Sequence, residues 1–299
     1  MNKYISLSKD VKAALENNKP VIALESTIIS HGMPYPQNME VARELENIAM
    51  ESGVIPATIA IIDGKLKAGL SNDELKTLAT ADNVSKVSLR DISKILINRS
   101  IGATTVAATM FIANLAGIKV FATGGIGGVH RFVSDTMDVS ADMTAFSQIP
   151  VIVVTAGAKA ILDLEKTIEY LETLGVPLYG YKTDEFPAFY TSSSGIKIER
   201  IDDEKDIADI FSTNTELGLK TGMIVANPIP QKYEIGKSIM DKTILTALEE
   251  MKNNGIIGKK VTPYLLSKIV ELTHGESLKA NIELVKNNVR LACRIAKQF

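Results

Sequence analysis

The sequence alternates short apolar runs with amphipathic stretches along its whole length, and this alternation most constrains the fold. The apolar runs are rich in β-branched residues, are bounded by Gly or Pro, and have the length of buried strands. Between them, apolar residues recur with the period of a helix. Such alternation favours a mostly parallel central sheet with helices on both faces. We therefore predict a three-layer α/β/α fold, formed by a single domain over residues 1–299.

The individual elements follow from the same pattern. Strands are expected at Val21–Leu24, Thr58–Ile62, Val84–Val87, Lys119–Ala122, Val151–Val154, Leu178–Tyr181 and Gly222–Ala226. Helices are expected at residues 9–17, 37–52, 72–80, 104–116, 160–174, 203–213, 237–253 and 276–297. Asp63-Gly64 is a tight-turn signal, so Lys65–Gly69 should return as the second arm of a hairpin. Beyond about residue 234 the pattern is helical only, which predicts a helical C-terminal layer packed on the sheet.

Composition excludes several classes of protein. The net charge is −2 and the basic residues are scattered, so nothing indicates nucleic acid as a partner. Cys293 is the only cysteine, which excludes an internal disulfide and favours a reducing compartment. The first residues lack a signal-peptide core, and no apolar stretch reaches the ~18 residues of a membrane span. We expect a cytoplasmic protein with no membrane partner.

Lys159 lies where a predicted strand gives way to a predicted helix. The strand Val151–Val154 is followed by a Thr-Ala-Gly-Ala turn, and helical periodicity begins at Ile161. An apolar wall and the positive end of a helix both favour the neutral amine. A neutral lysine is a nucleophile that can form a Schiff base with a carbonyl carbon. The alternative is a solvated lysine on the first helical turn.

Glu25 directly follows the strand Val21–Leu24 and enters a Ser-Thr turn. An apolar wall raises the pKa of a carboxyl group, so Glu25 is a candidate proton donor near neutrality. The alternative is a carboxylate that caps a helix or forms a structural ion pair, because such pairs also perturb carboxylates.

A glycine-rich run, Thr123–Gly128, follows the strand Lys119–Ala122. Its four glycines, Gly124 and Gly125 among them, allow backbone N–H groups to turn inward and cradle a phosphate. A plain tight turn would also explain the run, and its spacing is not that of a dinucleotide-binding fingerprint. His130 comes directly after this run. Lys86 ends another strand and is either a point charge for a phosphate or a surface lysine.

Asp138, Ser140 and Asp142 are interleaved within five residues. On a helix the two carboxylates would share one face. One carboxylate together with several waters suits Mg²⁺ or Mn²⁺, which keep much of their hydration. The competing explanation is a helix start rich in Asp, which the helix dipole favours.

With these residues in view, the chain resembles the pseudouridine-5′-phosphate glycosidases, also called the indigoidine synthase A-like family. The resemblance spans residues 23–281 in one unbroken order. The motifs that carry it are Ala23–Pro36, Gly102–Met110, Phe121–Arg131, Asp138–Asp142, Ala156–Asp163, Tyr181–Tyr190, Asn227–Pro230 and Ser277–Asn281. One local difference is Leu89, which stands where the family often has an arginine.

The resemblance implies an α/β/α enzyme, a homotrimer with one Mn²⁺ per subunit and Mg²⁺ as the alternative ion. Its reaction is the reversible cleavage of pseudouridine 5′-phosphate to uracil and ribose 5-phosphate. Lys159 is similar to the nucleophile that forms an imine with C1′, Glu25 to the proton donor, and Asp138 to the metal ligand. We assign Asp142 to proton movement between C2′ and uracil. The matched or neighbouring positions that we expect to contact substrate are Lys86, Val106, Thr123, Gly124, Gly125, His130, Ser140, Ala141, Asp142 and Asn281.

Two other functions remain open at this point. One is a class-I-aldolase-like lyase on another sugar phosphate, which would share the lysine imine. The other is a non-enzymatic sugar-phosphate binding module. A binding module would not need Glu25, Lys159 and two aspartates at strand and helix ends.

Overall fold

The structure is a computed structural model that describes residues 2–256, 258 and 261–299. Its strands are β1 (Ile5–Leu7), β2 (Val21–Leu24), β3 (Ile55–Ile62), β4 (Lys65–Ala68), β5 (Ser85–Val87), β6 (Gly102–Thr104), β7 (Val120–Ala122), β8 (Ile152–Thr155), β9 (Leu178–Tyr181), β10 (Glu199–Ile201) and β11 (Met223–Ala226). They form one sheet in the order β1-β4-β3-β2-β7-β8-β11-β9-β10, and β6 joins β5 to β3.

From β3 to β10, every neighbouring pair in this order is parallel. Among the strands of the described residues, only β4 and β6 pair antiparallel, both with β3. All residues of β2, β7, β8 and β11 are buried, as expected for parallel strands covered on both faces. Because β2, β7 and β8 are adjacent and parallel, the residues that follow them emerge together at one edge of the sheet.

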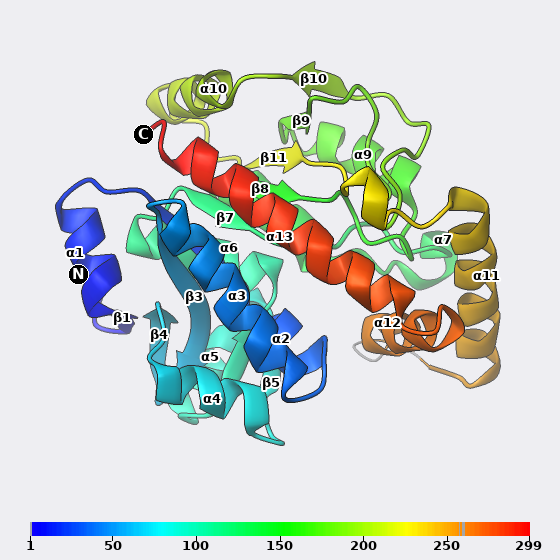
Figure 1. Cartoon of the computed structure of the whole chain (residues 1–299), viewed down its shortest axis with the longest axis horizontal. Helices are drawn as coiled ribbons and strands as arrows, with labels where there is room; N and C mark the ends of the chain where they lie inside the picture. Colours follow the sequence, from blue (N-terminus) through cyan, green and yellow to red (C-terminus); the bar gives the residue numbers. More distant parts are fainter. Residues whose placement is uncertain (1, 257, 259–260) are drawn as a thin grey trace.

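Helices cover both faces of this sheet. They are α1 (Lys9–Glu16), α2 (Thr27–His31), α3 (Gln37–Glu51), α4 (Asn72–Thr80), α5 (Ile92–Ile97), α6 (Val106–Ala116), α7 (Val133–Thr136), α8 (Ala141–Gln148), α9 (Leu164–Thr173), α10 (Glu204–Glu216), α11 (Lys237–Asn253), α12 (Val261–Leu272) and α13 (Glu276–Ala296). In Figure 1, α3 and α13 run across the front of the sheet while α6 lies behind it. No helix in the described part of the chain combines the length and the apolarity needed to cross a bilayer.

The predicted fold class is confirmed, because the sheet is mostly parallel and α13 packs on it through β7, β8 and β2. Each predicted strand is present, and Lys65–Ala68 forms the antiparallel hairpin arm with β3. Two predicted helix starts are wrong. The helix expected from residue 104 begins at Val106, because Gly102–Thr104 form β6. The helix expected from residue 160 begins at Leu164, where Asp163 caps it.

Candidate active site

A cavity of about 240 Å³ opens beyond the carboxyl ends of β2, β7 and β8. Ten of the residues that the sequence singles out line it. They are Glu25, Lys86, Val106, Gly124, Gly125, His130, Ser140, Asp142, Lys159 and Asn281. Side chains from distant parts of the chain therefore converge on one volume, at the sheet edge where ligands collect in open α/β folds.

Lys159 reaches the cavity from the segment after β8. Its Nζ donates a hydrogen bond of 2.7 Å to the carbonyl oxygen of Gly125. The backbone here pairs with the segment after β7, since Ala158 and Ile126 form a parallel bridge and Lys159 N donates to Ile126 O. The prediction that a helix begins directly after Lys159 is wrong, because α9 begins only at Leu164, and the alternative of a lysine on the first helical turn fails for the same reason. Pairing between two strand extensions, and not a helix dipole, positions the amine.

Glu25 lies opposite the glycine-rich run and is a carboxyl group with a raised pKa. Burial raises the pKa of Glu25 above its usual value, and the negative charge of Asp142 adds to the rise. The positive charge of Lys159 and a hydrogen bond from the Thr123 hydroxyl oppose it. The predicted elevation is confirmed, and its main cause is desolvation, as expected. Thr123 is itself buried behind the cavity and supports the carboxylate of Glu25.

Asp142 is anchored by backbone groups of two different elements. Its Oδ1 accepts a hydrogen bond of 2.9 Å from Ala107 N, at the start of α6. Its Oδ2 accepts one of 2.8 Å from Gly127 N. Asp142 lies in the first turn of α8, which Ser140 caps, whereas Asp138 precedes that helix. The prediction that Asp138 and Asp142 share a helix face is therefore wrong.

The glycine-rich run does not depend on left-handed backbone angles, since none of its four glycines has a positive φ. Its glycines instead let other groups approach closely. A Cβ on Gly125 would lie 2.4 Å from the Phe189 ring, and one on Gly127 would lie 2.2 Å from Ser140 Oγ. Gly127 N–H is already bound by Asp142, so the expectation that it cradles a phosphate is wrong.

Asp138 and Ala141 lie outside the lining of the cavity. Asp138 Oδ2 is 3.8 Å from Nδ1 of His130, and the Asp138 side chain is 42% exposed. Burial lowers the pKa of His130, and the Asp138 carboxylate opposes this effect. Within the described residues, no three His, Cys, Asp or Glu side chains gather as a metal-binding cluster. A solvent-accessible carboxylate of this kind fits a hard divalent ion that is held mostly by water.

Sequence reasoning missed about half of the cavity wall. The missed residues are Thr27, Ile28, His31, Gly32, Ser88, Thr105, Leu162, Phe189, Thr262, Pro263 and Leu266. Several belong to α2 and α12, which were not predicted individually. His31 and Phe189 stand inside motifs that carry the family resemblance, but no spacing rule indicates that their side chains face a ligand. Burial and the neighbouring Lys86 charge lower the pKa of His31.

Comparison with known proteins places the chain in a family. A profile described as "Indigoidine synthase A like protein" matches residues 10–298. A protein of Caldanaerobacter subterraneus subsp. tengcongensis named pseudouridine-5′-phosphate glycosidase is 56% identical over 300 residues, covering 100% of this chain and 98% of the relative. The solved structure of the prealnumycin C-glycosynthase AlnA in complex with ribulose 5-phosphate is 36% identical with a TM-score of 0.93, covering 100% and 97% of the two chains.

A second solved structure, an indigoidine synthase A-like protein of Thermotoga maritima, is 37% identical with a TM-score of 0.89. The match covers 99% of this chain and 97% of that one. Both the sequence match and the structural match therefore extend over essentially the whole chain. The chain belongs to the indigoidine synthase A-like protein family.

Proposed function

We propose that this enzyme is a pseudouridine-5′-phosphate glycosidase that acts through a lysine imine. The observation that carries the proposal is that the amine of Lys159 and the partly buried carboxyl group of Glu25 line one cavity. Relatives that bear this name and are more than half identical over nearly their full length support the substrate.

The chemistry requires such a pair because the bond to be broken joins two carbon atoms. Protonating a leaving nitrogen, as ordinary nucleosidases do, has no counterpart at a C–C bond. Attack of Lys159 Nζ on C1′ breaks the bond to the ring oxygen, which takes a proton from Glu25, so the ribose opens and C1′ carries both the lysine amine and uracil. When the C1′–uracil bond breaks, its electron pair stays on uracil and takes a proton, while the lysine nitrogen forms the protonated imine at C1′ that water then hydrolyses. In the synthetic direction that imine accepts the electron pair of uracil. The raised pKa of Glu25 supports this role, since the carboxyl group keeps its proton to a higher pH than an ordinary glutamate does.

Asp142 is proposed to move protons between C2′ and uracil. Each of its oxygens accepts one backbone hydrogen bond and retains a further lone pair, and the side chain lines the cavity. Lys86, with His130, is proposed to bind the 5′-phosphate, because both line the same cavity. Charge-assisted bonds of this kind are stronger than neutral ones.

Asp138 is proposed to hold one Mn²⁺ per subunit, with Mg²⁺ as the alternative. The exposed carboxylate beside His130 supports this assignment. Such an ion would orient water or the carbonyl groups of uracil. We further propose a homotrimer and a cytoplasmic location, on the strength of the motif resemblance and of a single, buried cysteine. Light scattering in solution would test the trimer.

The decisive experiment supplies uracil and ribose 5-phosphate and looks for a C-nucleoside product. An aldolase-like lyase would give no such product, and a binding module would give no turnover at all. In parallel, borohydride with ribose 5-phosphate should add the mass of the reduced sugar phosphate to the protein. The Lys159→Ala variant should keep its fold, lose turnover and gain no mass. Equal labelling of both proteins would refute the imine at Lys159.

A further inference from the structure

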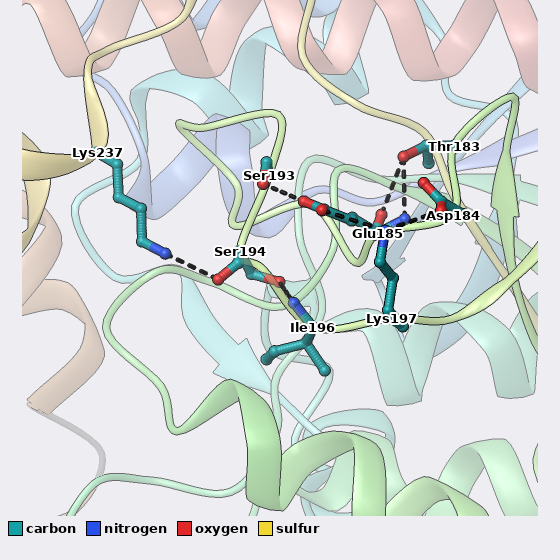
Figure 2. A network of polar contacts seen from close by, with 8 residues as sticks. All are labelled: Thr183, Asp184, Glu185, Ser193, Ser194, Ile196, Lys197 and Lys237. Carbon is teal, nitrogen blue, oxygen red and sulfur yellow. Dashed lines mark hydrogen bonds and ion pairs between the residues drawn. The ribbon is translucent and has the colours of Figure 1, made fainter.

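The loop between β9 and β10 is braced by polar contacts among its own residues and with Lys237 of α11, as Figure 2 shows. Glu185 N donates to Thr183 Oγ1 at 3.2 Å, and the Glu185 carboxylate accepts from the Ser193 hydroxyl. Lys237 of α11 donates to the carbonyl oxygen of Ser194 at 2.8 Å. These contacts fix both limbs of the loop, so its tip is held in one place.

Phe189 stands at that tip in a conformation that aromatic residues seldom adopt. Its φ of 66° lies in the left-handed region, where backbone strain persists only if the surroundings enforce it. Its backbone N–H donates to Ala156 O at 3.0 Å, and the Tyr190 ring meets it edge-on at 4.6 Å between centroids. Strain held by a braced loop at a cavity indicates a functional placement.

The Phe189 ring lies against Gly125, where a Cβ would approach it to 2.4 Å. The carbonyl oxygen of the same glycine accepts the hydrogen bond from Lys159 Nζ. On the neighbouring Gly124, a Cβ would lie 3.1 Å from Oδ1 of Asn281. The Phe189 ring and the Asn281 amide therefore lie beside the place where Lys159 would hold C1′. The group bonded to C1′ in the substrate is the base.

Phe189 is also distinct among the residues that line the cavity. In the described part of the chain it is the only Phe, Tyr or Trp there, and the other large apolar side chains, such as Ile28, Leu162 and Leu266, are aliphatic. A flat heterocycle packs on an aromatic face with a stacking energy that a branched aliphatic chain does not supply.

From this geometry we infer that Phe189 is a specificity-determining residue whose ring forms the wall against which uracil lies. The inference rests on the proposed function, since it concerns the base of that reaction. In the synthetic direction, the free base must return to the C1′ imine in a fixed orientation. The Phe189 wall restricts the base to a plane beside Lys159, and it does not touch the phosphate end of the sugar.

The test measures the two substrates separately in the synthetic direction. Phe189→Leu keeps an apolar side chain and removes the ring, so KM for uracil should rise by about 5- to 150-fold, the range of base–aromatic stacking energies. KM for ribose 5-phosphate and the extent of borohydride labelling should stay within about twofold of wild type. Phe211→Leu is the matched control, because Phe211 is a buried phenylalanine of α10 that does not line the cavity.

The other outcomes are equally informative. An unchanged KM for uracil overturns the inference, and so does a parallel rise in both KM values with reduced labelling, which would make the ring a mere support for Gly125 and Lys159. If Phe189→Leu fails to fold, Phe189→Met offers a second ring-free side chain of similar volume. If the wild type is not labelled, the proposed imine itself is refuted. This outcome distinguishes failure of the proposed reaction from failure of the proposed role of the Phe189 ring.

Discussion

Burial of the carboxyl group of Glu25, the proposed proton donor, comes at a cost in stability. Its pKa is raised by desolvation, so the folded protein binds that proton more tightly than the unfolded chain does. The free energy of unfolding therefore falls as pH rises from about 4.5 through the folded-state pKa. Above that window the folded state carries the full penalty of this carboxyl group.

Glu25→Gln should separate stability from activity. Gln cannot donate the catalytic proton, and turnover should fall by about 10²- to 10⁴-fold. Removing a carboxyl group with a raised pKa should make the variant more stable than wild type at pH 7, and this gain should disappear at pH 4. Urea unfolding at the two pH values measures the difference. If Glu25→Gln stabilises the protein less at pH 7 than at pH 4, the result contradicts this account.

Substitution of Lys86 tests whether its side chain binds the 5′-phosphate. Losing one charge-assisted contact costs roughly 1.5–3 kcal/mol, so Lys86→Ala should weaken the preference for pseudouridine 5′-phosphate over pseudouridine by about 10- to 150-fold. The comparison is kcat/KM for the two substrates in each protein. Lys94→Ala, at an exposed position on α5, is the matched control. If the Lys86 variant keeps the full preference, other groups hold the phosphate.

At the scale of elements, the C-terminal helix α13 is tied directly to the catalytic turn. Buried Asn288 donates from Nδ2 to Thr123 O at 2.7 Å and accepts at Oδ1 from Asn227 Nδ2 at 3.0 Å. This one side chain links α13 to the ends of β7 and β11. Thr123 in turn donates to the carboxylate of Glu25. The position of α13 is thereby coupled to the acid.

Asn288→Leu should disrupt both stability and the site. It leaves a buried carbonyl and a buried amide without partners, each worth about 1–3 kcal/mol, so the free energy of unfolding should fall by about 2–5 kcal/mol. Activity should drop under conditions where the variant is still folded. The neighbouring Asn287→Leu removes one partly buried bond, to Pro228 O, and should cost about 1 kcal/mol. If urea unfolding shows similar losses in the free energy of unfolding for the two variants, the proposed coupling of α13 to Glu25 is contradicted.

Sequence patterns located elements well where the periodic signal is long, and poorly where it is short. β2, β8 and β11 are apolar runs that only a covered parallel sheet accommodates. β1, β6 and β10 have three residues each, too few for any period to show. In α12, Pro263 is typical of a turn, yet it stands in the first helical turn, where proline is tolerated.

At the scale of the whole molecule, sequence reasoning identified ionisable residues that line the cavity but missed much of the rest of its wall. Glu25 and Lys159 stand out because an ionisable residue after a buried strand is conspicuous. Phe189 does not, because its role depends on a left-handed turn and on contact with Gly125, neither of which leaves a periodic trace. The hydrogen bond that Gly127 N–H donates could not be predicted either, because its acceptor, Asp142, is fifteen residues away in the sequence.

The proposed metal ion affects the activity of the enzyme as a whole. An ion held by one exposed carboxylate and mostly by water should be stripped easily, so chelation should abolish activity and Mn²⁺ should restore it. Asp138→Ala should need much more Mn²⁺ for the same rate. Asp135→Ala removes an exposed carboxylate three residues away and is the control. Full activity after exhaustive chelation would show that the reaction needs no ion.

The tie between α13 and the catalytic turn also has a consequence for protein synthesis. The ribosome makes Glu25 first and Asn288 last among the residues that define the site, and translation between them takes on the order of tens of seconds. Throughout that time the nascent chain already contains Glu25, and later Lys159, but not the helix that holds the turn at Thr123. Translation products that stop before α13 should therefore lack activity.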